Sequence, residues 1–322
     1  MKNGRMVKTL AIILALLSVL SITGCSAAKK GYTVGICQLV PHDALDAATK
    51  GFKDALIEAV GEENVKFEEQ NAAGDPATCA TIVNGFVSSN VDLIMANATP
   101  ALQAAAAATA TIPVLGTSVT EYGVALSIDN FTGLVGNNIS GTSDLAPLDQ
   151  QAAMIKEWFP DAKTVGLLYC SAEANSQYQV DTVQKELEAL GYTCAQYAFS
   201  DSNDIAAVCQ TASDNSDVIY VPTDNTVAAN TGIVDNICRG VTPVIAGEEG
   251  ICKGCGVATL SISYYDLGVA TGKMAAKILK GEAKVNEMPI EYAPQFTKKW
   301  NEVIAADLGL TAPDGYEAIV LE

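Results

Sequence analysis

Polar side chains recur where apolar runs of the chain end, and these side chains are the ones that could bind a ligand or take part in a reaction. In the first half of the chain they are mostly uncharged, whereas carboxylates join them in the second half. The junctions between the predicted strands and helices, taken in order, include Gln38, His42, Thr99, Pro100, Ser118, Glu173, Asn175, Asp224, Asn225 and Glu248. Hydroxyl, amide and carboxylate groups of this kind orient small polar ligands, so they indicate a solute-binding site.

Two of these positions favour opposite charges on a ligand. Thr99-Pro100 opens an Ala-rich run, so Thr99 is expected to cap a helix whose free N–H groups suit a carboxylate or another anion. Asp224 is expected at the same rim as Glu173 and Glu248, where a carboxylate pairs with an ammonium group. A plainer interpretation stays open for both, in which Thr99 and Asp224 only cap the helices that follow them.

The same residues argue against an enzyme. His42 is the one histidine of the chain and no Gly-x-Ser-x-Gly motif is present, so a hydrolase triad lacks its parts. The stretch from Gly268 to Lys273 lacks the spacing of a phosphate loop, and no carboxylates form a glycosidase pair. We expect no catalytic residue, no metal and no cofactor.

Eight cysteines follow Cys25, and seven of them divide into two groups. Five occupy apolar strand or helix positions, where a free buried thiol is usual: Cys37, Cys79, Cys170, Cys209 and Cys238. Cys252 and Cys255 lie in a Gly-rich stretch that is expected to be a loop, and a zinc site would need two more nearby ligands. A local disulfide and two free thiols both stay open for this pair.

Residues 1–24 have the composition of a secretion signal. A basic head precedes an apolar run from Leu10 to Ile22, which is too short to cross a bilayer. The sequence Ile22-Thr23-Gly24-Cys25 resembles the lipobox of bacterial lipoproteins, which implies lipidation at Cys25 and a tether over residues 25–30. A plain secretion signal is the alternative. We expect an extracytoplasmic protein that a lipid anchors to the cell membrane.

The charge of the chain limits its partners. After removal of residues 1–24 the chain carries 16 basic and 37 acidic residues, a formal charge of −21. Phosphates repel a protein that is this acidic, which argues against nucleic acid as a partner.

Strand and helix patterns alternate along the chain, and they must position the polar residues. Strands are predicted over 32–38, 65–69, 91–96, 112–116, 164–170, 192–199, 217–222, 243–246 and 257–262. Helices are predicted over 43–60, 99–110, 149–159, 177–190, 204–212, 226–239 and 265–279, with others from Pro76 and near 297–308. The alternation predicts an α/β fold of two doubly wound parallel-sheet lobes. In such sheets ligands bind beyond the carboxyl ends of the strands.

Five stretches carry a resemblance to a known family. They are residues 34–48, 97–101, 141–144, 220–227 and 264–268. In them the sequence resembles the substrate-binding lipoproteins of ABC importers, and is most similar to the family that includes tryptophan and tyrosine transport proteins. The resemblance implies a type I periplasmic-binding-protein fold, with lobes at 31–142 plus 263–290 and at 143–262 plus 291–322, joined by three crossovers.

The resemblance also implies roles for the polar residues. The α-carboxylate of an amino acid would lie on the N–H groups around Thr99, Pro100 and Ser118, and its ammonium near Asp224 or Glu173. Asn175 and Asn225 would complete the hydrogen bonds, while Gln38, His42 and Asp144 would line the cleft. Where relatives carry an Asp-rich turn, this chain has Gly247-Glu248-Glu249-Gly250, a difference that changes the pocket's depth and leaves the ligand's identity open.

The expected function is capture of a small solute by lobe closure and delivery to a permease whose ATPase is a separate subunit. A sugar or nucleoside receptor is one alternative, which the scarcity of aromatics near the rim weakens, since Trp158 and Trp300 lie in helix-like stretches. A sensing module that presents ligand to a receptor is another.

Overall fold

The computed structural model describes residues 31–321, and the chain from Tyr32 onward forms one compact unit. The signal segment, Cys25 and the tether lie outside the described residues. Within those residues, no helix has both the length and the apolar character needed to span a bilayer.

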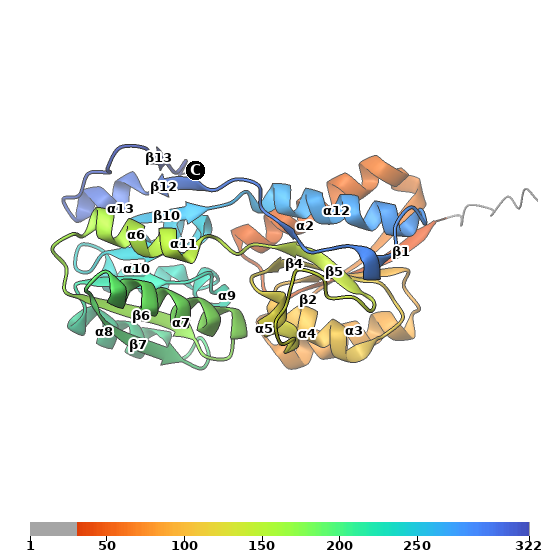
Figure 1. Ribbon diagram of the computed structural model, residues 1–322, viewed down its shortest axis with the longest axis horizontal. Helices are drawn as coiled ribbons and strands as arrows, with labels where there is room; N and C mark the ends of the chain where they lie inside the picture. Colours follow the sequence, from red (N-terminus) through yellow and green to blue (C-terminus); the bar gives the residue numbers. More distant parts are fainter. Residues whose placement is uncertain (1–30, 322) are drawn as a thin grey trace, which may run out of the picture. The chain divides into compact units, whose positions relative to one another are not determined.

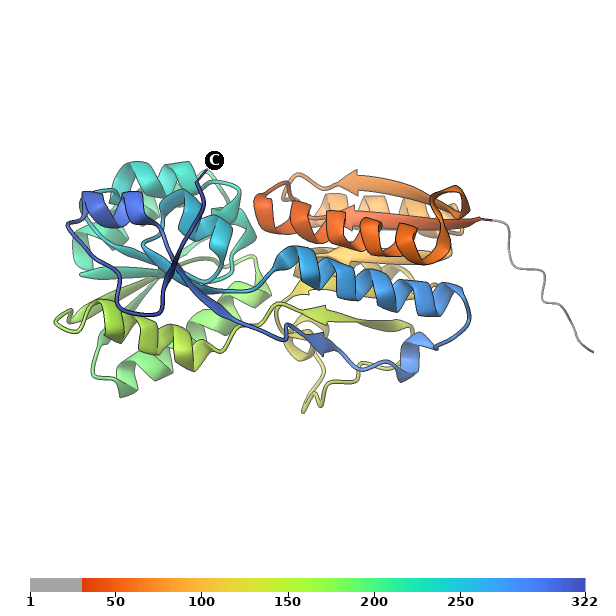
Figure 2. The same cartoon turned by 90° about the horizontal axis from the view of Figure 1, so that it is seen from above.

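The first lobe is built on a six-stranded sheet in the order β11-β5-β4-β3-β1-β2, in which all neighbours are parallel. Its strands are β1 (Tyr32–Gln38), β2 (Val65–Asn71), β3 (Leu93–Asn97), β4 (Val114–Val119), β5 (Ile139–Ser143) and β11 (Glu291–Tyr292). Its helices are α2 (Asp43–Val60), α3 (Pro76–Ser88), α4 (Thr99–Ala108), α5 (Tyr122–Leu126) and α12 (Tyr264–Leu279). Helices α2 and α12 cover one face and α3 and α4 the other (Figures 1 and 2).

Apolar side chains on both faces of this sheet explain why its strands are buried. Ile36 and Phe52 belong to the core beneath α2 and α12, and Cys37 and Phe86 to the core beneath α3 and α4. A parallel strand that is covered on both faces is expected to be apolar along its whole length, as the burial of β3 at every position shows.

Helices α2 and α12 approach each other closely because glycines line their contact. A Cβ atom on Gly51 would lie 2.1 Å from the Tyr265 carbonyl oxygen, and one on Gly268 would lie 2.0 Å from that of Ala48. No side chain fits at such distances, so any larger residue would force the two helices apart.

The second lobe is built on a seven-stranded sheet in the order β13-β12-β10-β9-β8-β6-β7. Its strands are β6 (Thr164–Cys170), β7 (Thr193–Phe199), β8 (Val218–Val221), β9 (Val244–Ala246), β10 (Ala258–Ser261), β12 (Thr297–Trp300) and β13 (Glu317–Ala318). Its helices are α6 (Leu148–Trp158), α7 (Ala174–Ala189), α8 (Ile205–Asn215), α9 (Asn225–Ala228), α10 (Thr231–Cys238), α11 (Glu249–Cys255) and α13 (Glu302–Asp307). Short 3₁₀ turns occupy Glu62–Asn64 and Val285–Glu287.

The chain passes between the two sheets three times. It leaves the first sheet after β5, returns after β10 to form α12, and leaves again after β11 to form β12. The α/β class, the two parallel-dominated sheets and the three crossovers are therefore confirmed. The exact lobe boundaries stay predictions, because they depend on which residues move together.

Three local predictions were wrong. The helix expected near 297–308 begins only at Glu302, because Thr297–Trp300 forms strand β12 antiparallel to β10. The single helix expected over 226–239 is two helices, α9 and α10. Cys252 and Cys255 lie in helix α11 and not in a loop, and both are buried free thiols.

Candidate ligand-binding site

The eleven predicted residues lie where the carboxyl ends of the strands meet the following helices. On the first lobe Gln38 ends β1, His42 precedes α2, Thr99 and Pro100 begin α4, Ser118 lies in β4 and Asp144 follows β5. On the second lobe Glu173 and Asn175 lie at the start of α7, Asp224 and Asn225 at the start of α9, and Glu248 before α11. All are buried except His42, which is partly exposed.

Asp224 is bound by the backbone of its own lobe. Its Oδ1 accepts a hydrogen bond from the Val227 N–H (2.9 Å) and its Oδ2 from the Cys170 N–H (2.7 Å). The carboxylate therefore caps α9, as the plainer interpretation predicted. Burial, together with the nearby Glu173, raises the pKa of Asp224 to about 7.

Both carboxylate oxygens of Glu173 also accept hydrogen bonds from groups of the second lobe. Oε1 accepts hydrogen bonds from the Thr226 N–H (2.9 Å) and hydroxyl (2.7 Å). Oε2 accepts from the Asn225 N–H (3.1 Å), from the Asn225 amide (2.6 Å) and from the Asn175 amide (3.2 Å). Five donors fix this carboxylate against the start of α9, where the free N–H groups of a helix favour negative charge.

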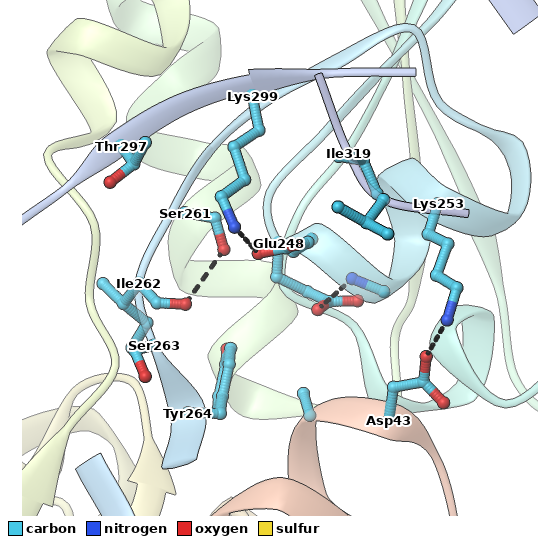
Figure 3. Close-up of a pocket in the computed structure, with 14 residues that line it drawn as sticks. Asp43, Glu248, Lys253, Ser261, Ile262, Ser263, Tyr264, Thr297, Lys299 and Ile319 are labelled. Carbon is cyan, nitrogen blue, oxygen red and sulfur yellow. Dashed lines mark hydrogen bonds and ion pairs between the residues drawn. The ribbon is translucent and has the colours of Figure 1, made fainter. Parts of the chain in front are cut away.

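Glu248 is the third carboxylate of this edge, and it caps α11. Its two oxygens accept from the Gly250 N–H (2.7 Å) and the Ile251 N–H (2.5 Å). Burial raises its pKa to about 7. Figure 3 shows Glu248 in a cavity of about 330 Å³, beside Tyr264 and an ion pair between Asp43 and Lys253 (3.2 Å).

Two residues at the first-lobe edge that are not glycine have strained backbone. Ala98, not Thr99, occupies the N-cap position of α4, with φ of +88°, so the predicted cap was wrong by one residue. Ser118 has φ of +52° where the β4–β5 register shifts between Gly116 and Val119. Such strain in residues other than glycine persists where the surrounding structure requires it, and it is common at ligand sites.

Asp144 lies at a crossover, and only one of its two carboxylate oxygens has a hydrogen-bond partner. Its Oδ2 accepts a hydrogen bond from the Tyr264 hydroxyl (3.0 Å), while its Oδ1 is buried without a hydrogen-bond partner. Burial raises the pKa of Asp144, which the nearby Thr120 and Tyr264 hydroxyls oppose. Since Tyr264 begins α12, this bond joins the crossover after β5 to the crossover after β10.

Buried polar atoms without a partner are concentrated at these strand ends. Seven side-chain atoms of the described residues are in this state: His42 Nδ1, Asn97 Oδ1, Ser118 Oγ, Asp144 Oδ1, Trp158 Nε1, Asn175 Oδ1 and Thr259 Oγ1. Five of the seven end or follow strands β1, β3, β4, β5 and β6. A buried polar atom without a partner is costly, so this cluster marks a place where a polar ligand would supply the missing bonds.

Two contacts connect the lobes beside this cluster. His42 Nε2 lies 3.2 Å from Asn225 Oδ1, and the neighbouring Asp43 pairs with Lys253. Gln38, in contrast, is held inside the first lobe, where it donates to Asp46 (2.6 Å) and accepts from Thr49 (2.6 Å). Gln38 therefore supports the site from below, and nothing in its bonding faces the second lobe.

The predicted residues border several cavities. A cavity of about 370 Å³ is lined from the first lobe by Leu39, Val40 and Pro100 and from the second by Glu173, Asn225 and Ala229, among others. A further cavity of about 360 Å³ includes His42, and Glu248 lines the one in Figure 3. In the part of the chain that the structure describes, no group of three or more His, Cys, Asp or Glu residues is placed to hold a metal ion.

Sequence reasoning missed two residues that shape the site. Tyr264 was left outside the predicted helix, although Ser263 caps α12 by accepting from the Asp266 N–H (3.2 Å). Gln179, buried in α7, exchanges two hydrogen bonds with the Thr223 backbone (3.1 and 3.2 Å). The spacing of Ser263 and Asp266, a serine three residues before an acid, was the available signal for the first. Nothing in the sequence identified the second.

Comparisons with known proteins agree on one family. The family model described as ABC transporter substrate binding protein matches residues 33–319. The tyrosine-binding protein of Clostridioides difficile (strain R20291) is 35% identical over 304 residues, which cover 88% of this chain and 87% of that protein.

Two solved structures differ in ligand state. An ABC domain from Streptococcus pneumonia in complex with L-Trp is 33% identical, with a TM-score of 0.85 over 90% of this chain and 100% of that one. A substrate-binding protein with adhesive properties from Clostridium difficile, in its ligand-free, open form, is 36% identical, with a TM-score of 0.68 over 90% of this chain and 100% of that one.

Proposed function

Because the chain belongs to the ABC transporter substrate-binding family, we propose that it captures a free amino acid between its lobes and delivers it to a membrane permease. The observation that carries the proposal is the set of unpartnered buried atoms on Ser118, Asp144 and Asn175. They come from both lobes, so a ligand that satisfies them stabilises the closed arrangement.

The carboxylate of the ligand lies at the start of α4. The first N–H groups of a helix have no acceptor within the helix, and they favour a negative charge. Ser118 Oγ, which is 5% exposed as a residue and has no partner, supplies a side-chain donor beside them. Thr99 and Pro100 border this position.

The ammonium of the ligand lies at Asp144 and Asn175, whose Oδ1 atoms are buried acceptors without donors. This assignment replaces the ammonium partners expected from the sequence, Asp224 and Glu173. Their oxygens already accept seven hydrogen bonds from groups of their own lobe. A carboxylate with a buried oxygen that accepts no hydrogen bond attracts a cation more strongly than one whose oxygens already accept several.

The relatives support an aromatic amino acid as the ligand, since one is a tyrosine-binding protein and another was solved with L-Trp. The higher TM-score to the L-Trp complex than to the open, ligand-free relative supports a closed arrangement of the described lobes. The remaining parts of the proposal are the lipid anchor at Cys25, an extracytoplasmic location, a permease with a separate ATPase, and no enzymatic step.

A thermal-shift screen of residues 30–322 against the amino acids, with sugars and nucleosides alongside, tests the proposal. A ligand at 100 times its Kd adds about 2.7 kcal/mol to the free energy of unfolding and raises Tm by several degrees. A shift with tyrosine, tryptophan or phenylalanine is expected. A shift with sugars or nucleosides alone would contradict the amino-acid site while leaving a receptor.

A further inference from the structure

The unpartnered atoms of the cleft contain more acceptors than an ammonium group can satisfy. Four of the five are acceptors in their present bonding: His42 Nδ1, Asn97 Oδ1, Asp144 Oδ1 and Asn175 Oδ1. An α-ammonium carries three N–H donors, and each reaches an acceptor only within about 3 Å. A ligand that satisfies this edge therefore needs a donor elsewhere on its structure.

The hydrogen bonds of Asn225 fix which nitrogen of His42 is the acceptor. The Asn225 amide nitrogen donates to Glu173 Oε2 (2.6 Å), so its Oδ1 is the atom that faces His42 Nε2 at 3.2 Å. Since an amide oxygen only accepts, Nε2 carries the proton and Nδ1 of the neutral ring has a bare lone pair. Nδ1 is buried without a partner, and the His42 side chain does not cap α2.

Strand order separates His42 from the position of the ammonium. Asp144 follows β5 and His42 follows β1, and the sheet runs β5-β4-β3-β1 between them. Three strand spacings amount to about 14 Å. Two hydrogen bonds of about 3 Å at the ends leave about 8 Å for the ligand between its ammonium and its second donor. Serine and threonine are too short for this span, and the indole N–H of tryptophan also falls short of it, whereas the phenol hydroxyl of tyrosine covers it.

His42 itself lines the cavity of about 360 Å³, and Ala229 borders both that cavity and a second one, which has room for the ring that such a donor requires. Leu39, Val40 and Pro100 line this second cavity from the first lobe and Ala229 from the second lobe, and Asn225, the partner of His42, lies in the same wall. Its volume of about 370 Å³ holds a ring with room to spare. The lining also includes acidic and polar residues, among them Asp75, Glu173 and Asp201, so the ring would lie between apolar and polar walls.

We propose that His42 Nδ1 accepts a hydrogen bond from the side chain of the ligand, so that the site selects amino acids whose side chain carries a donor. The inference rests on the proposed function, because it takes the ammonium to be at Asp144. His42 is then a specificity-determining residue: it costs affinity when a ligand without a donor leaves its buried lone pair unfilled.

Calorimetry at pH 7.5 with matched ligand pairs tests this inference. The pairs are tyrosine with phenylalanine and tyrosine with O-methyltyrosine. In the unaltered protein the member with a donor is expected to bind about 10- to 100-fold more tightly. In H42A that ratio falls to about 1. In K253A, which removes the other contact between the lobes and keeps both His42 and Asn225, both members weaken together and the ratio persists.

Each other outcome overturns the inference in a distinct way. Equal affinity within every pair for the unaltered protein overturns the donor requirement and leaves the amino-acid receptor standing. A ratio that survives in H42A shows that another residue reads the donor. Absence of binding by every amino acid overturns the proposed function itself. The Tm of each variant without ligand, measured beside that of the unaltered protein, separates loss of the fold from loss of recognition.

Discussion

The cleft edges of the two lobes differ in how many of their buried polar atoms lack a hydrogen-bond partner. The second lobe presents three buried carboxylates, Glu173, Asp224 and Glu248, and each is bound by N–H or hydroxyl donors of that lobe. The edge of the first sheet presents fewer charges, yet Ser118 in β4 and Asp144 at the crossover after β5 each keep a buried atom without a partner, and on the second lobe the uncharged Asn175 does so too. A charge at a strand end therefore does not by itself mark a ligand contact; its unused bonding capacity does.

The largest effect expected from this contrast is on affinity at Asp144. D144N keeps an acceptor for the Tyr264 hydroxyl but removes the charge from the ammonium position, so Kd for the amino acid should rise about 100-fold, equivalent to about 3 kcal/mol. Burial raises the pKa of Asp144, so the variant should melt no lower than the parent. Calorimetry and thermal melting measure both.

D224N is the matched control for that variant. It places an amide N–H₂ against one of the two backbone N–H groups that the carboxylate accepts from, so stability should fall by about 2 kcal/mol while Kd changes less than about fivefold. If D224N weakens binding more than D144N in folded protein, the contrast between the two edges is wrong.

The second effect concerns stability and pH at Glu248. Its pKa is about 7 in the folded protein against an ordinary 4.5, so the folded state holds the proton longer and the free energy of unfolding falls as pH rises from about 4.5 to 7. The contribution is about 3 kcal/mol at most. Urea unfolding of E248Q should show a shallower decline over that window. If the free energy of unfolding of E248Q falls with pH as steeply as that of the parent, Glu248 does not cause the decline.

A third, smaller effect is expected at Ser118. S118A removes a hydroxyl that has no partner in the protein, so stability should hold while Kd rises about tenfold. S118G is the companion variant, because glycine relieves the positive φ of this position and lacks the same hydroxyl. Equal affinity losses in both assign the effect to the hydroxyl; unchanged affinity in both would exclude a ligand contact.

The smallest effect is a pH dependence of binding through His42. Burial lowers the pKa of His42 in the described arrangement, and the nearby acids Glu173, Asp46 and Asp43 oppose that shift. An open form with the ordinary value near 6.5 binds a proton that closure must release, so Kd should rise about threefold between pH 7 and 6. H42Q should remove that part of the dependence. Tighter binding at pH 6 would reverse the sign and refute it.

Periodicity in the sequence was sufficient for most of the fold. The predicted bounds of β1, α2 and β6 match the structure, because each segment carries its apolar pattern within itself. The prediction failed where pairing at a distance decides the structure: Thr297–Trp300 is a strand because it pairs with β10, about 40 residues earlier. In α11, Ile251, Cys252 and Cys255 follow a helical period that two glycines concealed.

The sequence was sufficient to predict where the site lies, but not which of its side chains are free to contact a ligand. The rule that ligands lie beyond the carboxyl ends of strands located the edges. Which oxygens stay free depends on partners far away in the sequence, such as Thr226, 53 residues after Glu173. No local pattern records that pairing, so Asp224 and Glu173 looked as available as Asp144.

The glycine-lined contact between α2 and α12 gives the first lobe a long, rigid helix that begins beside the cleft. Helix α2 has 18 residues, about 27 Å of rise. Its first turn lies beside the cleft, and its last, at Val60, lies at the far end. At Gly51 and Gly268 helix α2 packs closely against α12, which begins at the crossover. We therefore expect α2 to move as a rigid body when the lobe rotates. A dye attached near Val60, paired with one on the second lobe, would convert solute capture into an optical signal without touching the cleft.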